Sequence, residues 1–161
     1  MQVIGIDISK ATFDVTLLSN ERKHRQFANQ ASGFKQLSKW LRAEQAGQVH
    51  ACMEATNIYW EALALYLHEA GHRVSVVNPA RIKGFAQSQL QRSKTDKQDS
   101  WVIATFCAQT TPDAWTPPSQ SERKLRALVR HREALQKTHT QQKNRIAHTT
   151  DEDVQASLQT L

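Results

Sequence analysis

Cysteine, glycine and proline are scarce in this chain of 161 residues, which contains 2 Cys, 5 Gly and 4 Pro. Two cysteines cannot build the disulfide framework of a small secreted domain. Cys52 and Cys107 both lie in apolar runs, where thiols usually behave as small buried hydrophobic groups. So little Gly and Pro excludes collagen-like and low-complexity chains. The composition therefore predicts a folded domain with at most one appendage.

Long hydrophobic runs are also missing. No apolar stretch approaches the roughly 18 residues that can span a bilayer. The N-terminus lacks the basic and then apolar segments of a signal peptide. The seven histidines show no ligand spacing with cysteine, which argues against a zinc site. We therefore expect a cytoplasmic protein without zinc.

Acidic residues are too few to balance the basic ones, and the formal net charge is +6. The surplus lies in residues 119–149, which hold eight basic and two acidic side chains, while the rest of the chain is neutral. The basic residues are Arg123, Lys124, Arg126, Arg130, Arg132, Lys137, Lys143 and Arg145. A surplus of this kind favours a polyanionic partner, with nucleic acid first among the candidates.

The same segment contains neither Gly nor Pro and predicts one long helix. Its leucines recur at heptad-like spacing, but arginine, histidine and glutamine interrupt the stripe. The helix can therefore pair two chains as a coiled coil, lie along nucleic acid, or pack lightly on the body as a solvated helix. Because Trp115-Thr116-Pro117-Pro118 precedes it, we expect a body at residues 1–114 and a helical extension at 115–161.

The first hundred residues alternate between strand and helix periodicity. Strands are expected at 2–7, 12–18, 23–28, 49–53 and 73–78. Helices are expected after Ser32 as N-cap, at 58–70 with Gly71 as the closing residue, and from Asp96 onward. This order predicts an α/β fold whose mixed sheet has a three-stranded antiparallel meander, two parallel strands and flanking helices, as in ribonuclease-H-like proteins.

Two acidic residues end apolar strands in this scheme. Asp7 follows the first strand and Glu54 the fourth, and the carboxyl ends of such strands gather at one crevice of an open sheet. The two acids could share a metal ion there. The alternative is that each carboxylate only caps backbone amides or meets solvent.

A second acidic pair begins the last predicted helix of the body. Thr95 and Gln98 have the spacing of a capping box, so Asp96 and Asp99 fall on one face of the first turns. The helix dipole alone favours acids here, which explains Asp96 better than Asp99. Four clustered carboxylates repel one another unless cations offset them, and all-oxygen sites suit Mg²⁺ or Mn²⁺. Nearby basic residues could hold a phosphate backbone: Arg81, Lys83, Arg92, Lys94 and Lys97.

These residues lie in four ordered blocks: Gly5-Ile6-Asp7-Ile8-Ser9-Lys10, Met53-Glu54-Ala55-Thr56, Val77-Asn78-Pro79 and Lys94-Thr95-Asp96-Lys97-Gln98-Asp99. Together they resemble the N-terminal, RuvC-like domain of DEDD transposases of bacterial insertion sequences, the Piv and MooV relatives. The resemblance implies that the four acids are catalytic metal ligands in site-specific DNA recombination. It further implies a coiled-coil region and, in members of the family, a structured guide RNA.

The resemblance also has departures. Family members continue into a domain that contributes a nucleophilic serine, whereas this chain ends at Leu161, so we expect incomplete strand exchange from these residues alone. Asn57 stands where the family usually has glycine.

Two other functions fit parts of the sequence. Gly5-Ile6-Asp7 also resembles the opening of actin-like ATPases and sugar kinases, but Ser9-Lys10 replaces their glycine-rich phosphate turn. A non-enzymatic module is the second alternative, with the sheet as scaffold and the basic helix binding nucleic acid or another copy of the chain.

Overall fold

The computed structural model describes residues 1–19, 22–88 and 96–148, with the backbone alone at 96–98. The chain divides into two units, Met1–Pro117 and a second unit that starts at Pro118. Of the second unit, the description reaches residue 148. The predicted DNA-binding residues Arg92 and Lys94, and the side chain of Lys97, lie outside the described residues.

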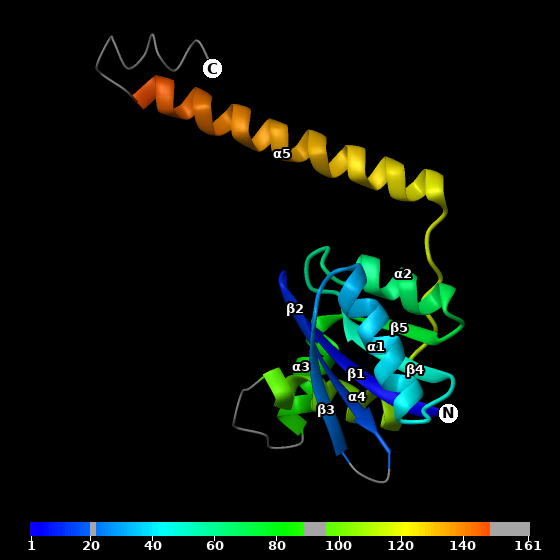
Figure 1. Cartoon of the computed structure of the whole chain (residues 1–161). Helices are drawn as coiled ribbons and strands as arrows, with labels where there is room; N and C mark the ends of the chain where they lie inside the picture. Colours follow the sequence, from blue (N-terminus) through cyan, green and yellow to red (C-terminus); the bar gives the residue numbers. More distant parts are fainter. Residues whose placement is uncertain (20–21, 89–95, 149–161) are drawn as a thin grey trace. The chain divides into compact units, whose positions relative to one another are not determined.

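Five strands form one mixed sheet in the order β3-β2-β1-β4-β5 (Figure 1). The strands are β1 (Gln2–Ile8), β2 (Thr12–Leu18), β3 (Arg22–Ala28), β4 (Val49–Glu54) and β5 (Arg73–Val77). β2 pairs antiparallel with β1 and β3, whereas β4 pairs parallel with β1 and β5. The predicted ribonuclease-H-like arrangement of a meander extended by two parallel strands is confirmed.

Helices cover both faces of this sheet. α1 (Ala31–Ala43) and α2 (Glu61–Glu69) pack on one face, where Ile4 and Ile6 of β1 join the larger hydrophobic cluster. α3 (Pro79–Ser88) and α4 (Asp96–Thr110) pack on the other, where Cys52 of β4 joins a second cluster. Neighbouring residues of a strand point to opposite faces, so the central strands contribute apolar residues to both clusters, while β3 is mostly exposed or half-buried.

The helix boundaries correct two predictions. Ser32 is not the N-cap of α1, because the helix begins at Ala31 after an extended Gln30 that makes no side-chain capping bond. α2 begins at Glu61 and not at residue 58, since residues 57–60 form a turn. Gly71 closes α2 as predicted, with a left-handed φ of 83°.

Two further features complete this unit. α3 was not predicted, although Asn78-Pro79 carried the signal: the Asn78 side chain accepts a hydrogen bond from the Ala80 amide at 2.8 Å, and Pro79 is the first helical residue. Cys52 and Cys107 are buried free thiols, as predicted. The contact with Cys107, and then burial, raise the pKa of the Cys52 thiol.

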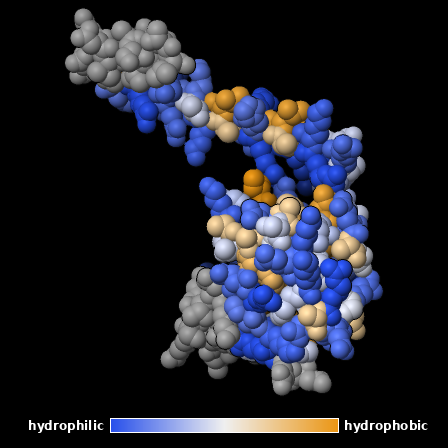
Figure 2. Space-filling view, viewed as in Figure 1, coloured by the Kyte–Doolittle hydropathy of each residue, from blue (hydrophilic) through white to orange (hydrophobic). Residues whose placement is uncertain are grey.

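The second unit contains α5 (Gln120–His148), which has no buried residue along this length. Its surface is mostly hydrophilic, with apolar patches standing out in Figure 2. The exposed apolar residues are Leu125, Leu128, Val129 and Leu135. None of the helices in the described part of the chain has the length and apolar character needed to cross a membrane.

Candidate active site

Two carboxylates lie at the carboxyl ends of neighbouring parallel strands, Asp7 as the next-to-last residue of β1 and Glu54 as the last residue of β4. Ile6 of β1 pairs with Met53 of β4, so Asp7 and Glu54 follow side by side. Each lies two residues beyond a residue that packs under α3 and α4, Gly5 in β1 and Cys52 in β4. Because strand side chains alternate between faces, both acids belong to that face. Both are half-buried.

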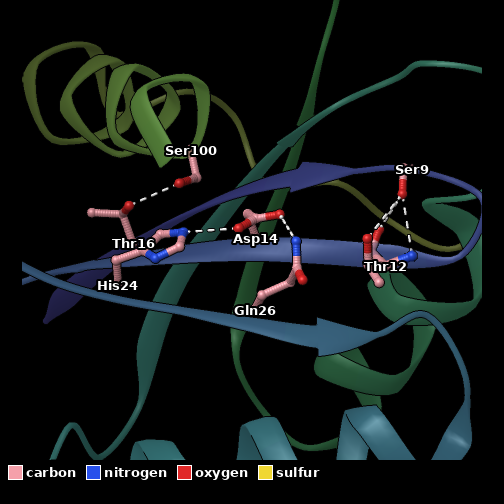
Figure 3. Close-up of polar contacts among 7 residues, drawn as sticks. All are labelled: Ser9, Thr12, Asp14, Thr16, His24, Gln26 and Ser100. Atoms are coloured by element: carbon pink, nitrogen blue, oxygen red, sulfur yellow. Dashed lines mark hydrogen bonds and ion pairs between the residues drawn. The ribbon is translucent and has the colours of Figure 1, made fainter. Parts of the chain in front are cut away.

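The backbone of helix α4 lies so close to β1 that no side chain would fit at Gly5. A Cβ atom on Gly5 would lie 2.1 Å from the backbone nitrogen of Ala104 and 2.2 Å from the carbonyl oxygen of Ser100. The Ser100 hydroxyl also hydrogen-bonds to the Thr16 hydroxyl of β2 at 2.8 Å (Figure 3). Asp99 directly precedes Ser100 and is half-buried. The packing at Gly5 therefore places α4, which carries the third predicted acid, on the sheet face to which Asp7 and Glu54 belong.

A buried carboxylate that the sequence analysis missed lies directly across from Asp7. Asp14 of β2 pairs with Asp7 in the antiparallel register and is 6% exposed. Its two oxygens contact Nε2 of His24 and Nε2 of Gln26, both at 2.9 Å (Figure 3). Thr12, Asp14 and Thr16 alternate with apolar residues, which indicates that these polar side chains share one face of the strand. Only the register of β2 against β1 places Asp14 beside Asp7.

Local contacts shape the chain after Glu54. The Thr56 hydroxyl donates a hydrogen bond to Oε1 of Glu54 at 2.9 Å. Asn57 then adopts a left-handed conformation with φ of 54°. Glycine takes this conformation without strain, and asparagine is among the side-chain-bearing residues that tolerate it best. The departure from the family glycine at this position therefore preserves the backbone turn.

The fourth predicted acid, Asp96, is the first residue of α4, and its side chain lies outside the described residues. Among the side chains that are described, no three carboxylate, imidazole or thiol groups are arranged to hold a metal ion. The four-carboxylate metal site therefore stays a prediction. Its donors would all be carboxylate oxygens, which fit Mg²⁺ or Mn²⁺.

The predicted DNA-binding residues that are described lie on two helices. Arg81 and Lys83 are exposed on α3, where the Arg81 guanidinium lies 5.5 Å from the ring centre of Phe106. The residues on α5 are exposed as well: Arg123, Lys124, Arg126 and Arg130. Arg22 of β3 adds a basic side chain that the sequence pattern did not indicate, and its guanidinium lies 4.9 Å from the ring centre of Trp101 in α4.

Comparison with known proteins identifies the family. Residues 4–152 match the model of a transposase family, DEDD_Tnp_IS110. The chain belongs to this DEDD transposase family. The pilin gene-inverting proteins of Moraxella bovis and Moraxella lacunata are each 41% identical to this transposase-family chain over 133 residues. Those matches cover 81% of the chain and 41% of each relative, so the chain spans about two fifths of the relatives' length.

Solved structures of RuvC from Thermus thermophilus also match this transposase-family chain, at 14% identity. One covers 69% of the chain and 97% of RuvC with a TM-score of 0.48. The other, RuvC in complex with a Holliday junction substrate, covers 68% and 96% with a TM-score of 0.46. Both structural matches have TM-scores below 0.5.

Proposed function

We propose that Met1–Pro117 supplies the metal-dependent catalytic centre of a transposase that cleaves and exchanges DNA strands for an insertion sequence. The observation that carries this proposal is the position of Asp7 beside Glu54 at the ends of neighbouring parallel strands, under the helix that begins with Asp96 and carries Asp99. Carboxylates placed so near one another favour a bound cation. The names of the Moraxella relatives describe gene inversion, which is a DNA rearrangement of this kind.

The chain's own contribution is to hold carboxylate oxygens in fixed places. Asp7 and Glu54 stand on paired strands, and Asp99 stands on a helix fixed against Gly5. Ligands on strands and helices are held more accurately than ligands on loops. Mg²⁺ or Mn²⁺ bound by these acids would supply charge neutralisation at a phosphodiester and activation of the attacking hydroxyl.

The basic residues would hold the nucleic acid. Arg81 and Lys83 of α3 and the neighbouring Arg92, Lys94 and Lys97 would contact DNA phosphates near the acids. The exposed arginines and lysines of α5 would extend this contact, and its exposed leucines would pair two copies of the chain. A structured guide RNA, which the family resemblance implies, would bind through its phosphates to the same kind of basic side chain. The protein would act in the cytoplasm, on bacterial DNA.

We propose that these residues supply strand cleavage and not the whole exchange. The chain spans about two fifths of its Moraxella relatives, and the family resemblance implies a further domain with a nucleophilic serine. Strand cleavage, metal binding and DNA binding are therefore the activities to measure on this chain.

Calorimetric titration of the full chain with Mn²⁺ tests the proposal. We expect binding by the wild type and at least about tenfold weaker binding by Asp7→Asn and Glu54→Gln, since each substitution removes a charged ligand. Glu69→Gln is the matched control, because it removes one negative charge from exposed α2 on the opposite face of the sheet. Metal-dependent nicking of DNA should follow the same order.

The competing non-enzymatic module gives a different result. Its DNA binding would fall with rising salt as the transposase's does, but neither carboxylate substitution would change any activity. A folded wild-type chain that binds no Mn²⁺ would overturn the proposed catalytic centre.

A further inference from the structure

Asp14 carries a negative charge that its hydrogen bonds do not require. The side chain is 6% exposed, and both carboxylate oxygens have partners on β3. An ionised carboxylate only accepts hydrogen bonds, so His24 and Gln26 each donate from Nε2. An asparagine could join β2 to β3 through the same side-chain positions, because it carries one acceptor and one donor group. Joining the strands therefore does not explain the charge.

The negative charge of Asp14 lies beside another carboxylate, that of Asp7. Asp14 and Asp7 are directly opposite in an antiparallel pair, where side chains lie on the same face and like charges repel. Asp7 in turn stands beside Glu54. A row of three carboxylates thus crosses β2, β1 and β4 at one end of the sheet. Asp14 is its most buried member, and two side chains of β3 engage both of its oxygens.

We propose that Asp14 is a positioning residue for the acid site, whose fixed charge strengthens the hold of Asp7 on a divalent cation. This inference rests on the function proposed above. Because His24 and Gln26 engage both oxygens, Asp14 acts through Asp7 and is not itself a metal ligand. The His24 imidazole and the Gln26 amide hold the two oxygens of this carboxylate in fixed positions. Burial limits screening by salt, so the charge still acts one strand away.

Mn²⁺ titration of the full chain tests this role with two variants. Asp14→Asn keeps the shape of the side chain and one acceptor oxygen, replaces the other oxygen by a donor and removes the charge, and it should weaken Mn²⁺ binding by about tenfold. Gln26→Lys leaves Asp14 in place but sets a cation beside it at an exposed position, and it should weaken binding by roughly threefold. Glu69→Gln serves again as the control and should bind within about twofold of wild type, since its charge lies on the opposite face.

The outcomes distinguish failure of the role proposed for Asp14 from failure of the proposed catalytic centre. No Mn²⁺ binding by the wild type overturns the proposed catalytic centre. Wild-type affinity in Asp14→Asn, with only a lower unfolding midpoint, shows that Asp14 merely joins strands and overturns the inference alone. If Asp14→Asn does not fold, Gln26→Lys decides: weaker binding supports the role, and unchanged binding rejects it.

Discussion

The two units of this chain are stabilised in different ways. All the buried hydrophobic residues in the described part of the chain lie within Met1–Pro117, whereas α5 buries none over its described length. The first unit has paired strands with helices on both faces, and residues far apart in the sequence fix one another. In the second unit, hydrogen bonds and charges within the helix stabilise the structure. In the described part of the chain, contacts between residues far apart in the sequence fix side chains in the first unit and not in α5.

The contacts that fix the two long helices, α4 and α5, show this difference. α4 is fixed by tertiary contact, at Gly5 and through the hydrogen bond between Ser100 and Thr16. α5 is fixed locally by a capping box, in which the Ser119 amide donates to Glu122 at 2.7 Å and the Glu122 amide donates to the Ser119 hydroxyl at 3.2 Å. Substitutions at these points should affect one unit and spare the other.

The largest effect is expected from Gly5→Ala. The added methyl group would meet the backbone of α4, which cannot move aside as a flexible side chain could. We expect the first unit to lose about 3 kcal/mol or more of its free energy of unfolding. Urea denaturation followed by tryptophan fluorescence reports on this unit alone, because the four tryptophans all lie in it.

Gly84→Ala is the matched control for that substitution. Gly84 lies inside α3, and, apart from its own turn of the helix, no atom of the described residues lies within 4 Å of the position that an added methyl group would take. Alanine there should stabilise the unit by about 0.5–1 kcal/mol, because glycine in a helix interior carries an entropic cost. Equal effects at the two glycines would contradict the close packing of α4 on β1.

An intermediate effect is expected at the contact between Thr16 and Ser100. Both residues are fully buried, so Ser100→Ala leaves the Thr16 hydroxyl without this partner and should cost about 1–3 kcal/mol. Thr16→Val with Ser100→Ala should cost less than the sum of the single changes, since neither hydroxyl is then left without the other. A strictly additive double-mutant cycle in urea would show that the two hydroxyls are not coupled.

The smallest effect is expected at the start of α5. Hydrogen bonds from Ser119 hold the pKa of the Glu122 carboxyl below its ordinary value. The ionised form therefore favours the helix, and this stabilisation is present at neutral pH and lost as pH falls through the pKa in the folded helix. Acidification should fray about one turn of α5, measured as lost helical circular dichroism at 222 nm.

Glu122→Gln is the control for this pH effect. It should show a smaller acid-dependent loss of helix than the wild type, because the titrating group is gone. Tryptophan-detected unfolding of the first unit should be the same in both proteins. A wild-type helix signal that stays unchanged as the pH falls below the ordinary pKa of glutamate and through the lowered pKa of Glu122 would contradict the role of the capping box.

The predictable parts of the fold are those that depend on neighbouring residues. The apolar run ending in Glu54 defined the end of β4, the run ending in Asp7 defined the end of β1 to within one residue, and the left-handed Gly71 defined a helix end. Ser32 was misassigned as an N-cap because serine has that preference in general, while the chain begins α1 after Gln30 with no side-chain cap. Asn78-Pro79 held a helix start that was overlooked, although each residue is typical of its position.

The sequence by itself determined the order of the strands and of every helix except α3, the basic character of residues 119–149 and the acids of the family motif, because periodicity, charge and motif spacing are properties of nearby residues. Only the tertiary structure decided that Asp14 faces Asp7 and that Gly5 admits α4 to the sheet. Those facts depend on strand register and on the distance between backbones. Residues far apart in the chain set both, so no local pattern records them.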